Sequence, residues 1–161
     1  SQVLRVGLLL NIVIGCGYGL YYGLIADFTN QMPRANFPAK QLGLKLDQVW
    51  DAEIKSPLKV VIGETWIAGV TSVTSRYQPL VVPYGDYQAA AAANPELIKR
   101  CGALIVVDAN ENKSNSNVQA FMSRATIKGS FELAWNRFKS KPTYEVNWAI
   151  IEPEIKGACA Q

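Results

Sequence analysis

The chain has 161 residues, 49% of them hydrophobic, and a formal net charge of +3, which suits one globular domain of ordinary size with one membrane helix. Its 16 Lys and Arg residues are scattered along the chain, whereas a nucleic-acid-binding surface needs a clustered basic face, so we expect no nucleic-acid partner. The sequence contains no histidine, which excludes a Ser-His-Asp triad and removes the usual zinc ligand.

The first predicted element is an apolar helix over residues 6–26, between Arg5 and Asp27. About twenty uncharged residues, rising about 1.5 Å each, cross the roughly 30 Å of a bilayer's hydrocarbon. We therefore predict that residues 1–27 form a transmembrane span. A buried helix of a soluble protein and a signal peptide are the alternatives. Arg5 on the short side indicates that the N-terminus is cytoplasmic, which would place the following domain outside the cytoplasm.

Glycines give this helix a face that suits helix association. Gly15, Gly19 and Gly23 recur every fourth residue, and small residues at this spacing let another membrane helix approach closely. Asn11 is the one polar residue inside the run, and we expect it to face a partner helix. The expected partners are therefore the membrane and other helices of the same full-length protein.

A linker with two prolines is predicted over residues 28–38, and a soluble α/β domain over residues 39–161. The domain begins with an amphipathic helix that ends before Ser56 and Pro57. Its apolar face carries Leu42, Leu46, Val49, Trp50 and Ile54, and its polar face carries Asp47, Asp51 and Lys55.

Strands and helices alternate through the rest of the domain. Short apolar runs predict strands at residues 58–62, 79–82, 103–107 and 143–151. Helices are predicted at residues 65–74, 97–101, 118–125 and 130–139. This order predicts an α/β fold, a three-layer α/β/α sandwich with a small, mostly parallel sheet. The last strand alternates most strongly between apolar and polar residues, so we expect it at the edge.

Two of the three cysteines lie in the soluble part. Cys101 and Cys159 could form a disulfide in an oxidising compartment, or both could be free thiols. Cys101 precedes one predicted strand and Cys159 follows another, so a disulfide would favour opposite directions for those two strands. The spacing fits no metal-binding pattern.

Candidate binding residues follow the predicted strands, because ligands of open α/β sheets bind beyond the carboxyl ends of parallel strands. Glu64, Asp86, Asp108 and Asn110 could converge there on a sugar or a cation, and Trp66 could stack on a sugar ring. The alternative is that they are ordinary loop residues and helix caps. The sequence has no dinucleotide-binding or Walker motif. We expect no cofactor and no metal site within this chain, and the sequence does not decide on a divalent cation.

Four segments carry a resemblance to a known family. These are Ala35-Asn-Phe-Pro-Ala-Lys40, the run from Pro57 to Gly69 that contains Gly63-Glu-Thr-Trp66, the strand at Gln78 to Val81, and the strand at Gly102 to Val107. Together they resemble the C-terminal part of bacterial inner-membrane glycosyltransferases of the protein-mannosyltransferase and aminoarabinose-transferase type. The resemblance covers residues 6–108. The chain departs from the family in having Ala39 where Gly is common and Glu64 where Asp is common.

The resemblance implies a small periplasmic α/β domain that follows the last helix of a multi-span transferase. The donor would be a polyprenyl-phosphate-linked sugar, and the location would be the bacterial inner membrane. Family catalysis uses an acidic residue in a loop that no segment of this chain matches, so we expect no catalytic residue here and a role in substrate positioning. The alternative function is a single-pass envelope protein whose α/β domain binds a ligand or a partner protein.

Overall fold

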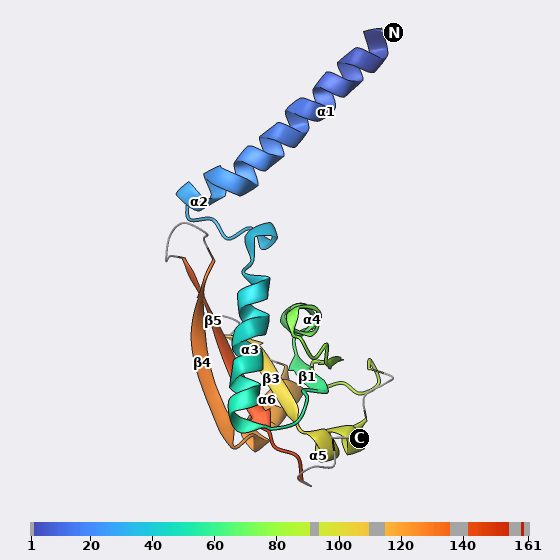
Figure 1. The fold of residues 1–161 in the computed structure, drawn as a ribbon, viewed down its shortest axis with the longest axis vertical. Helices are drawn as coiled ribbons and strands as arrows, with labels where there is room; N and C mark the ends of the chain where they lie inside the picture. The colour runs from blue at the N-terminus through green and yellow to red at the C-terminus, as the bar shows by residue number, and fades with distance from the viewer. Residues whose placement is uncertain (1, 91–93, 110–114, 136–141, 155–158, 160–161) are drawn as a thin grey trace. The chain divides into compact units, whose positions relative to one another are not determined.

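The computed structural model describes residues 2–90, 94–109, 115–135, 142–154 and 159 (Figure 1). The chain divides into two compact units. Unit 1 comprises Ser1–Pro38 with Ala134–Tyr144, and unit 2 comprises Ala39–Leu133 with Glu145–Gln161. The two units are described in turn.

Unit 1 begins with a long apolar helix. Helix α1 (Gln2–Leu20) continues through the π-helical turn η1 (Tyr21–Ile25) into α2 (Ala26–Phe28). Within the 24 residues of Gln2–Ile25, the most apolar 18-residue stretch has a mean hydropathy of 1.8 and no buried residue. Among the described residues, this is the one helix long and apolar enough to cross a membrane. The Asn11 amide donates to the Gly7 carbonyl at 2.9 Å, so its own helix supplies a hydrogen-bond partner.

The segment that follows the helix turns back onto it. The Asn36 side chain, at the end of the 3₁₀ helix η2 (Arg34–Asn36), donates to the Tyr22 carbonyl at 2.5 Å. The Tyr21 hydroxyl lies 2.6 Å from Gln31 Oε1 and donates to it. The predicted linker is therefore a folded segment that is hydrogen-bonded to the end of the apolar helix.

Three aromatic rings form the centre of unit 1. Phe37 meets Trp135 and Tyr144 edge to face, with ring centroids 5.0 and 5.3 Å apart. Trp135 and Tyr144 lie 5.6 Å from each other. The Trp135 indole also donates to the Pro33 carbonyl at 3.1 Å. Such edge-to-face pairs add to the stabilisation from buried area, and here they join segments about a hundred residues apart in sequence.

A single sheet of five strands forms the middle of the α/β fold, in the order β2-β1-β3-β5-β4. The strands are β1 (Val60–Gly63), β2 (Leu80–Pro83), β3 (Ala103–Asp108), β4 (Ile127–Ala134) and β5 (Thr143–Ile151). Strand β1 pairs in parallel with β2 and β3, and β3 pairs antiparallel with β5. The α/β class is confirmed, but the sheet is mixed where a mostly parallel one was expected.

Helices cover both faces of this sheet. Helices α5 (Pro95–Cys101) and α6 (Ser116–Arg124) cover one face, where Ile98 and Val118 join a buried cluster from the strands. Helices α3 (Ala39–Glu53) and α4 (Thr65–Thr74) pack against each other, and α4 packs against β1, β2 and β3. Side chains alternate between faces along a strand, so the equally buried Val61 and Leu104 point to the α3 and α4 side. The predicted three layers are confirmed.

Two predictions about the end of the chain are wrong. A helix was expected at residues 130–139, but the part described, to Trp135, is mostly strand β4. Ile127, Gly129, Phe131 and Leu133 alternate with more exposed residues, a period of two that belongs to strands. Strand β5 was expected at the edge, yet it lies between β3 and β4, because the missed strand takes the edge position.

A disulfide joins Cys101 to Cys159, with a Cα–Cα distance of 4.8 Å. Cys101 ends α5 just before β3, whose first residue Ala103 pairs with Ile151 at the end of β5. The antiparallel direction of β5 thus brings the C-terminal segment back to the end of the sheet where α5 lies. The sequence left open whether Cys101 and Cys159 pair, and the structure contains this disulfide. It also has the antiparallel strands that such a disulfide would favour.

Candidate functional site

The carboxyl ends of the three parallel strands meet at one edge of the sheet. Gly63 at the end of β1 lies beside Pro83 of β2 and Val106 of β3. The backbone N–H of Tyr84 donates to the Gly63 carbonyl at 2.7 Å, which extends the pairing past the strand. Glu64, which follows β1, and Asp108, the last residue of β3, are therefore placed along one edge.

Glu64 links β1 to α4 and is the residue before the first turn of that helix. Its backbone carbonyl accepts from the N–H of Ala68 at 2.9 Å. The residue is half-buried, and its Oε1 atom is shielded from solvent. A carboxylate at a helix N-terminus is stabilised by the helix dipole, so this position also serves the fold.

Trp66 lines an open, mostly apolar groove of about 590 Å³ along α4. The lining residues are Ala39, Thr65, Trp66, Gly69, Val70, Val73, Thr74 and Tyr84. The Thr74 hydroxyl donates to the Val70 carbonyl at 2.7 Å, and none of these lining residues is Asp, Glu, Lys or Arg. An indole and a phenol at such a surface can stack on the apolar face of a sugar ring.

Tyr84 is the groove residue that sequence reasoning missed. Its φ angle is 52° and that of Gly85 is 73°, and Asp86 N–H closes the turn on the Pro83 carbonyl at 2.9 Å. Positive φ is uncommon for a residue with a bulky side chain. Its place directly after a parallel strand was the available signal, because that edge is where ligands bind.

Asp86 and Asp108 do not line the groove. Asp86 is exposed, and its Oδ1 accepts from the Gln88 N–H at 2.8 Å, an ordinary turn contact. Asp108 is half-buried in β3, where it pairs with Val146. Asn110 lies outside the described residues. Of the five candidates, the structure therefore places Trp66 in the groove, with Glu64 two residues before it.

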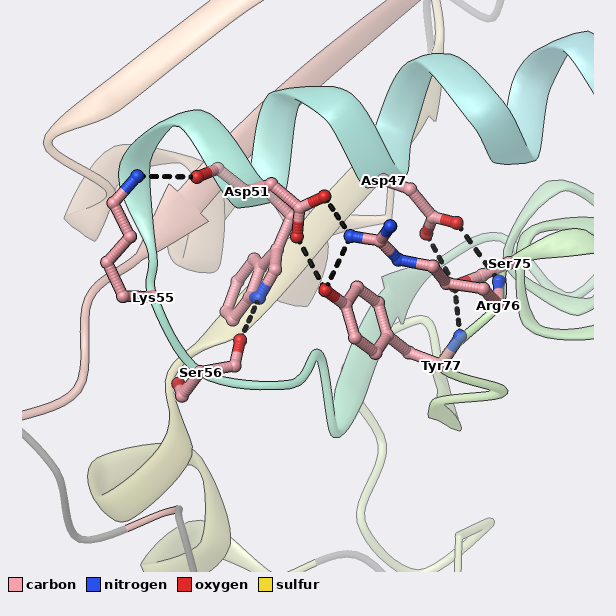
Figure 2. A network of polar contacts seen from close by, with 8 residues as sticks. Asp47, Asp51, Lys55, Ser56, Ser75, Arg76 and Tyr77 are labelled. Atoms are coloured by element: carbon pink, nitrogen blue, oxygen red, sulfur yellow. Dashed lines mark hydrogen bonds and ion pairs between the residues drawn. The ribbon is translucent and has the colours of Figure 1, made fainter.

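A polar network joins α3 to the end of α4 (Figure 2). Asp47 was predicted on the polar face of its helix but is buried. Its carboxylate accepts from the Ser75 hydroxyl at 2.6 Å and from the Arg76 N–H at 3.0 Å. One turn further along, Asp51 accepts from the Tyr77 hydroxyl at 2.6 Å and forms an ion pair with Arg76. The network fixes the loop between α4 and β2, and through it the end of the groove.

We expect Asp47→Ala to destabilise unit 2 by about 1–3 kcal/mol, since it leaves the Ser75 hydroxyl and the Arg76 N–H without their buried acceptor. Gln48→Ala, on the exposed side of the same helix, is the control and should change little. Urea unfolding of the full chain in vesicles, followed by tryptophan fluorescence, measures both variants. Equal unfolding midpoints would contradict a structural role for Asp47.

Tyr77 makes the domain lose stability as pH rises in the alkaline range. Its hydrogen bond to Asp51, with some desolvation, raises the pKa of the Tyr77 phenol above its ordinary value of 10.0. The folded state therefore holds this proton more tightly than the unfolded state, and the stability is lost as pH rises through the raised pKa. In unfolding measurements above about pH 10, Tyr77→Phe should show a shallower loss of stability than the unmodified chain. Parallel curves would refute this assignment.

The comparisons with known proteins add no relative: no family model, curated protein or solved structure matches this chain. Within the part of the chain that the structure describes, no three His, Cys, Asp or Glu residues cluster as they would to hold a metal ion. The apolar helix, the sheet edge and the groove are therefore the features of the molecule that bear on its function.

Proposed function

We propose that this chain is part of a bacterial inner-membrane glycosyltransferase that uses a polyprenyl-phosphate-linked sugar donor. In this proposal, unit 2 lies on the periplasmic side and positions substrate, while catalysis belongs to other parts of the full-length protein. The observation that carries the proposal is the unburied apolar helix over Gln2–Ile25, which leads directly into an α/β domain.

The helix supports a membrane location. Leu8, Leu9 and Leu10 of this helix are each at least 60% exposed, and an apolar surface of this extent is costly in water. Tyr18 and Tyr21 cluster toward the domain end of the helix, where aromatic residues favour the membrane–water interface. Lipid is the environment that suits both features.

The disulfide supports a location outside the cytoplasm. Disulfides persist in oxidising compartments such as the periplasm and are rare in the cytosol. Cys101 and Cys159 are both buried, which is typical of a structural rather than a catalytic pair. A domain outside the cytoplasm agrees with Arg5, because a basic residue just before the helix favours a cytoplasmic N-terminus.

The groove supports positioning rather than catalysis. Its lining residues include Trp66 and Tyr84 but no carboxylate, whereas glycosyl transfer and hydrolysis use acidic groups beside the reacting bond. Aromatic rings can hold a sugar without reacting with it. The resemblance of the Gly63 to Trp66 segment to the periplasmic domains of these transferases points to the same role.

A single-pass envelope protein that binds a ligand or a partner protein is the second candidate. The observation that favours it is that unit 2 has its own buried core on both faces of its sheet, as an independent binding domain would. Sugar transfer by the intact membrane protein separates the two candidates, because a binding protein transfers none.

The test is a transfer assay on the intact membrane protein with lipid-linked sugars. We expect Trp66→Ala to lower the transfer rate about tenfold, since an aromatic contact contributes up to about 1.5 kcal/mol, while the domain stays folded. Glu64→Ala should lower it as well, and Gln48→Ala, away from the groove, should not. Normal transfer by both site variants, or by protein without unit 2, would contradict the positioning role.

A further inference from the structure

Helix α4 is apolar on both of its sides. It carries no charged residue from Thr65 to Thr74. Its inner side, including Ile67, is buried against the sheet. Its outer side carries Trp66 and Val70, which line the groove, and Val73, which is 80% exposed. A helix that is hydrophobic on all sides is normally covered on all sides.

Helix α3 extends this apolar surface. A side chain at Gly43 would lie 2.6 Å from the Thr74 hydroxyl oxygen, so the two helices touch closely at this point. Leu44, which follows Gly43 in α3, is 61% exposed. Val73, which precedes Thr74 in α4, is 80% exposed. We call Leu44, Trp66, Val70 and Val73 the α4 patch.

The covalent chain limits how far the start of the groove can lie from the apolar helix. Asn36 is hydrogen-bonded to Tyr22 within the helix, at 2.5 Å. Ala39, which lines the groove, is three residues further on. Consecutive Cα atoms lie about 3.8 Å apart, so Ala39 is at most about 11 Å from Asn36 whatever the orientation of the two units. If the helix spans a bilayer, the groove begins close to the bilayer surface.

We propose that the α4 patch inserts into the interface of the same bilayer, at the boundary between headgroups and acyl chains. This inference rests on the proposed membrane span. Val73 and Leu44 are 80% and 61% exposed, and this open surface suits insertion better than enclosure of a ligand chain. Trp66 is of the type that favours this depth. The short tether gives the patch a high effective concentration at the surface.

Binding of this kind depends on apolar area and needs no anionic lipid, because the patch itself carries no charge. Docking would hold the Trp66 and Tyr84 end of the groove at headgroup height. A lipid-linked sugar presents its sugar at the same height. The patch would thus set the distance between the binding groove and a donor that stays in the membrane.

Spin labels on the full chain in phosphatidylcholine vesicles test this proposal. Three proteins are compared: one labelled at the native Cys16, and two in a Cys16→Ser background labelled through Val73→Cys or Ala120→Cys. Ala120 is an exposed residue of α6 on the opposite face of the sheet, and it is the matched control. Oxygen concentrates in lipid, and a water-soluble nickel complex stays in water.

We expect the label at residue 73 to have a several-fold higher ratio of oxygen to nickel collisions than the label at residue 120, unchanged by salt. Adding Leu44→Glu should lower that ratio, whereas Gln48→Glu should not. A label at residue 73 that is as open to nickel as the control would overturn docking. Shielding from both reagents would also overturn it, because the patch would then be covered by protein, such as a second copy.

The label at Cys16 separates the two proposals. If it is rich in oxygen while the label at residue 73 is open to nickel, the membrane span stands and docking is wrong. If the label at Cys16 is itself open to nickel, the proposed span fails, and docking fails with it.

Discussion

Gly63→Ala should destabilise unit 2 by about 3 kcal/mol or more, as expected when a side chain is forced into a packed core. A Cβ atom at this position would lie 2.2 Å from the carbonyl oxygen of Val106. That oxygen belongs to the neighbouring strand β3, which is buried on both faces and cannot move without disturbing the core. The substitution should therefore separate β1 from β3 and displace the loop that carries Glu64.

Gly69→Ala is the matched control for this substitution. No atom lies within 4 Å of a Cβ built at Gly69, which is in the middle of α4. Alanine is favoured over glycine inside a helix, so this variant should be stabilised by up to about 1 kcal/mol. Urea unfolding of both variants as full chains in vesicles should move their midpoints in opposite directions. A Gly63→Ala midpoint equal to that of the unmodified chain would contradict the packing described for β1 and β3.

Removing the disulfide should have an effect of similar size. The two cysteines are 58 residues apart in sequence, and closing a loop of this length in the unfolded chain contributes about 4 kcal/mol in the chain-entropy model. The double variant Cys101→Ser/Cys159→Ser should therefore unfold at a much lower urea concentration. A strong reductant should shift the unmodified chain by the same amount.

Cys16→Ser is the control for the double variant, because Cys16 forms no disulfide and lies exposed on the apolar helix. Its unfolding midpoint should be unchanged. If the double variant unfolded at the same urea concentration as this control, the disulfide would contribute nothing to stability. The disulfide would then no longer support the proposal that the domain lies in an oxidising compartment.

The sequence predicted the elements whose signals are local. Helix α4 has the predicted bounds. Helix α5 was also predicted, and Asn94 caps it, with its side chain accepting from the Leu97 N–H at 2.8 Å. Strand β5 also has the predicted bounds. Strand β4 was missed because Glu132 and Ala134 favour helices, and this preference obscured the alternation with a period of two. That one error also misplaced β5 at the edge.

Contacts between distant residues account for most of what the sequence did not predict. Asp47 is buried because Ser75, 28 residues away, donates to it. Unit 1 includes residues 134–144 because Trp135 reaches Pro33, 102 residues earlier. A periodic pattern within a short stretch of sequence cannot reveal contacts between residues this far apart. At the candidate site, the order of elements along the chain placed Glu64 and Trp66 just after a parallel strand, where the structure has them, but it did not reveal that the outer side of α4 is apolar.

In the proposed function, Gln2–Ile25 lies in lipid while the α/β domain lies in water, and the reactivity of the native Cys16 thiol distinguishes these two environments. The measurement is the rate at which a charged, membrane-impermeant maleimide modifies Cys16 of the full chain in sealed phosphatidylcholine vesicles. We expect Cys16 to stay unmodified until the protein is denatured in detergent, while a cysteine introduced by Ala120→Cys reacts at once on the outward-facing molecules. Modification of Cys16 in intact vesicles at the rate of that control would contradict the membrane span and the function proposed from it.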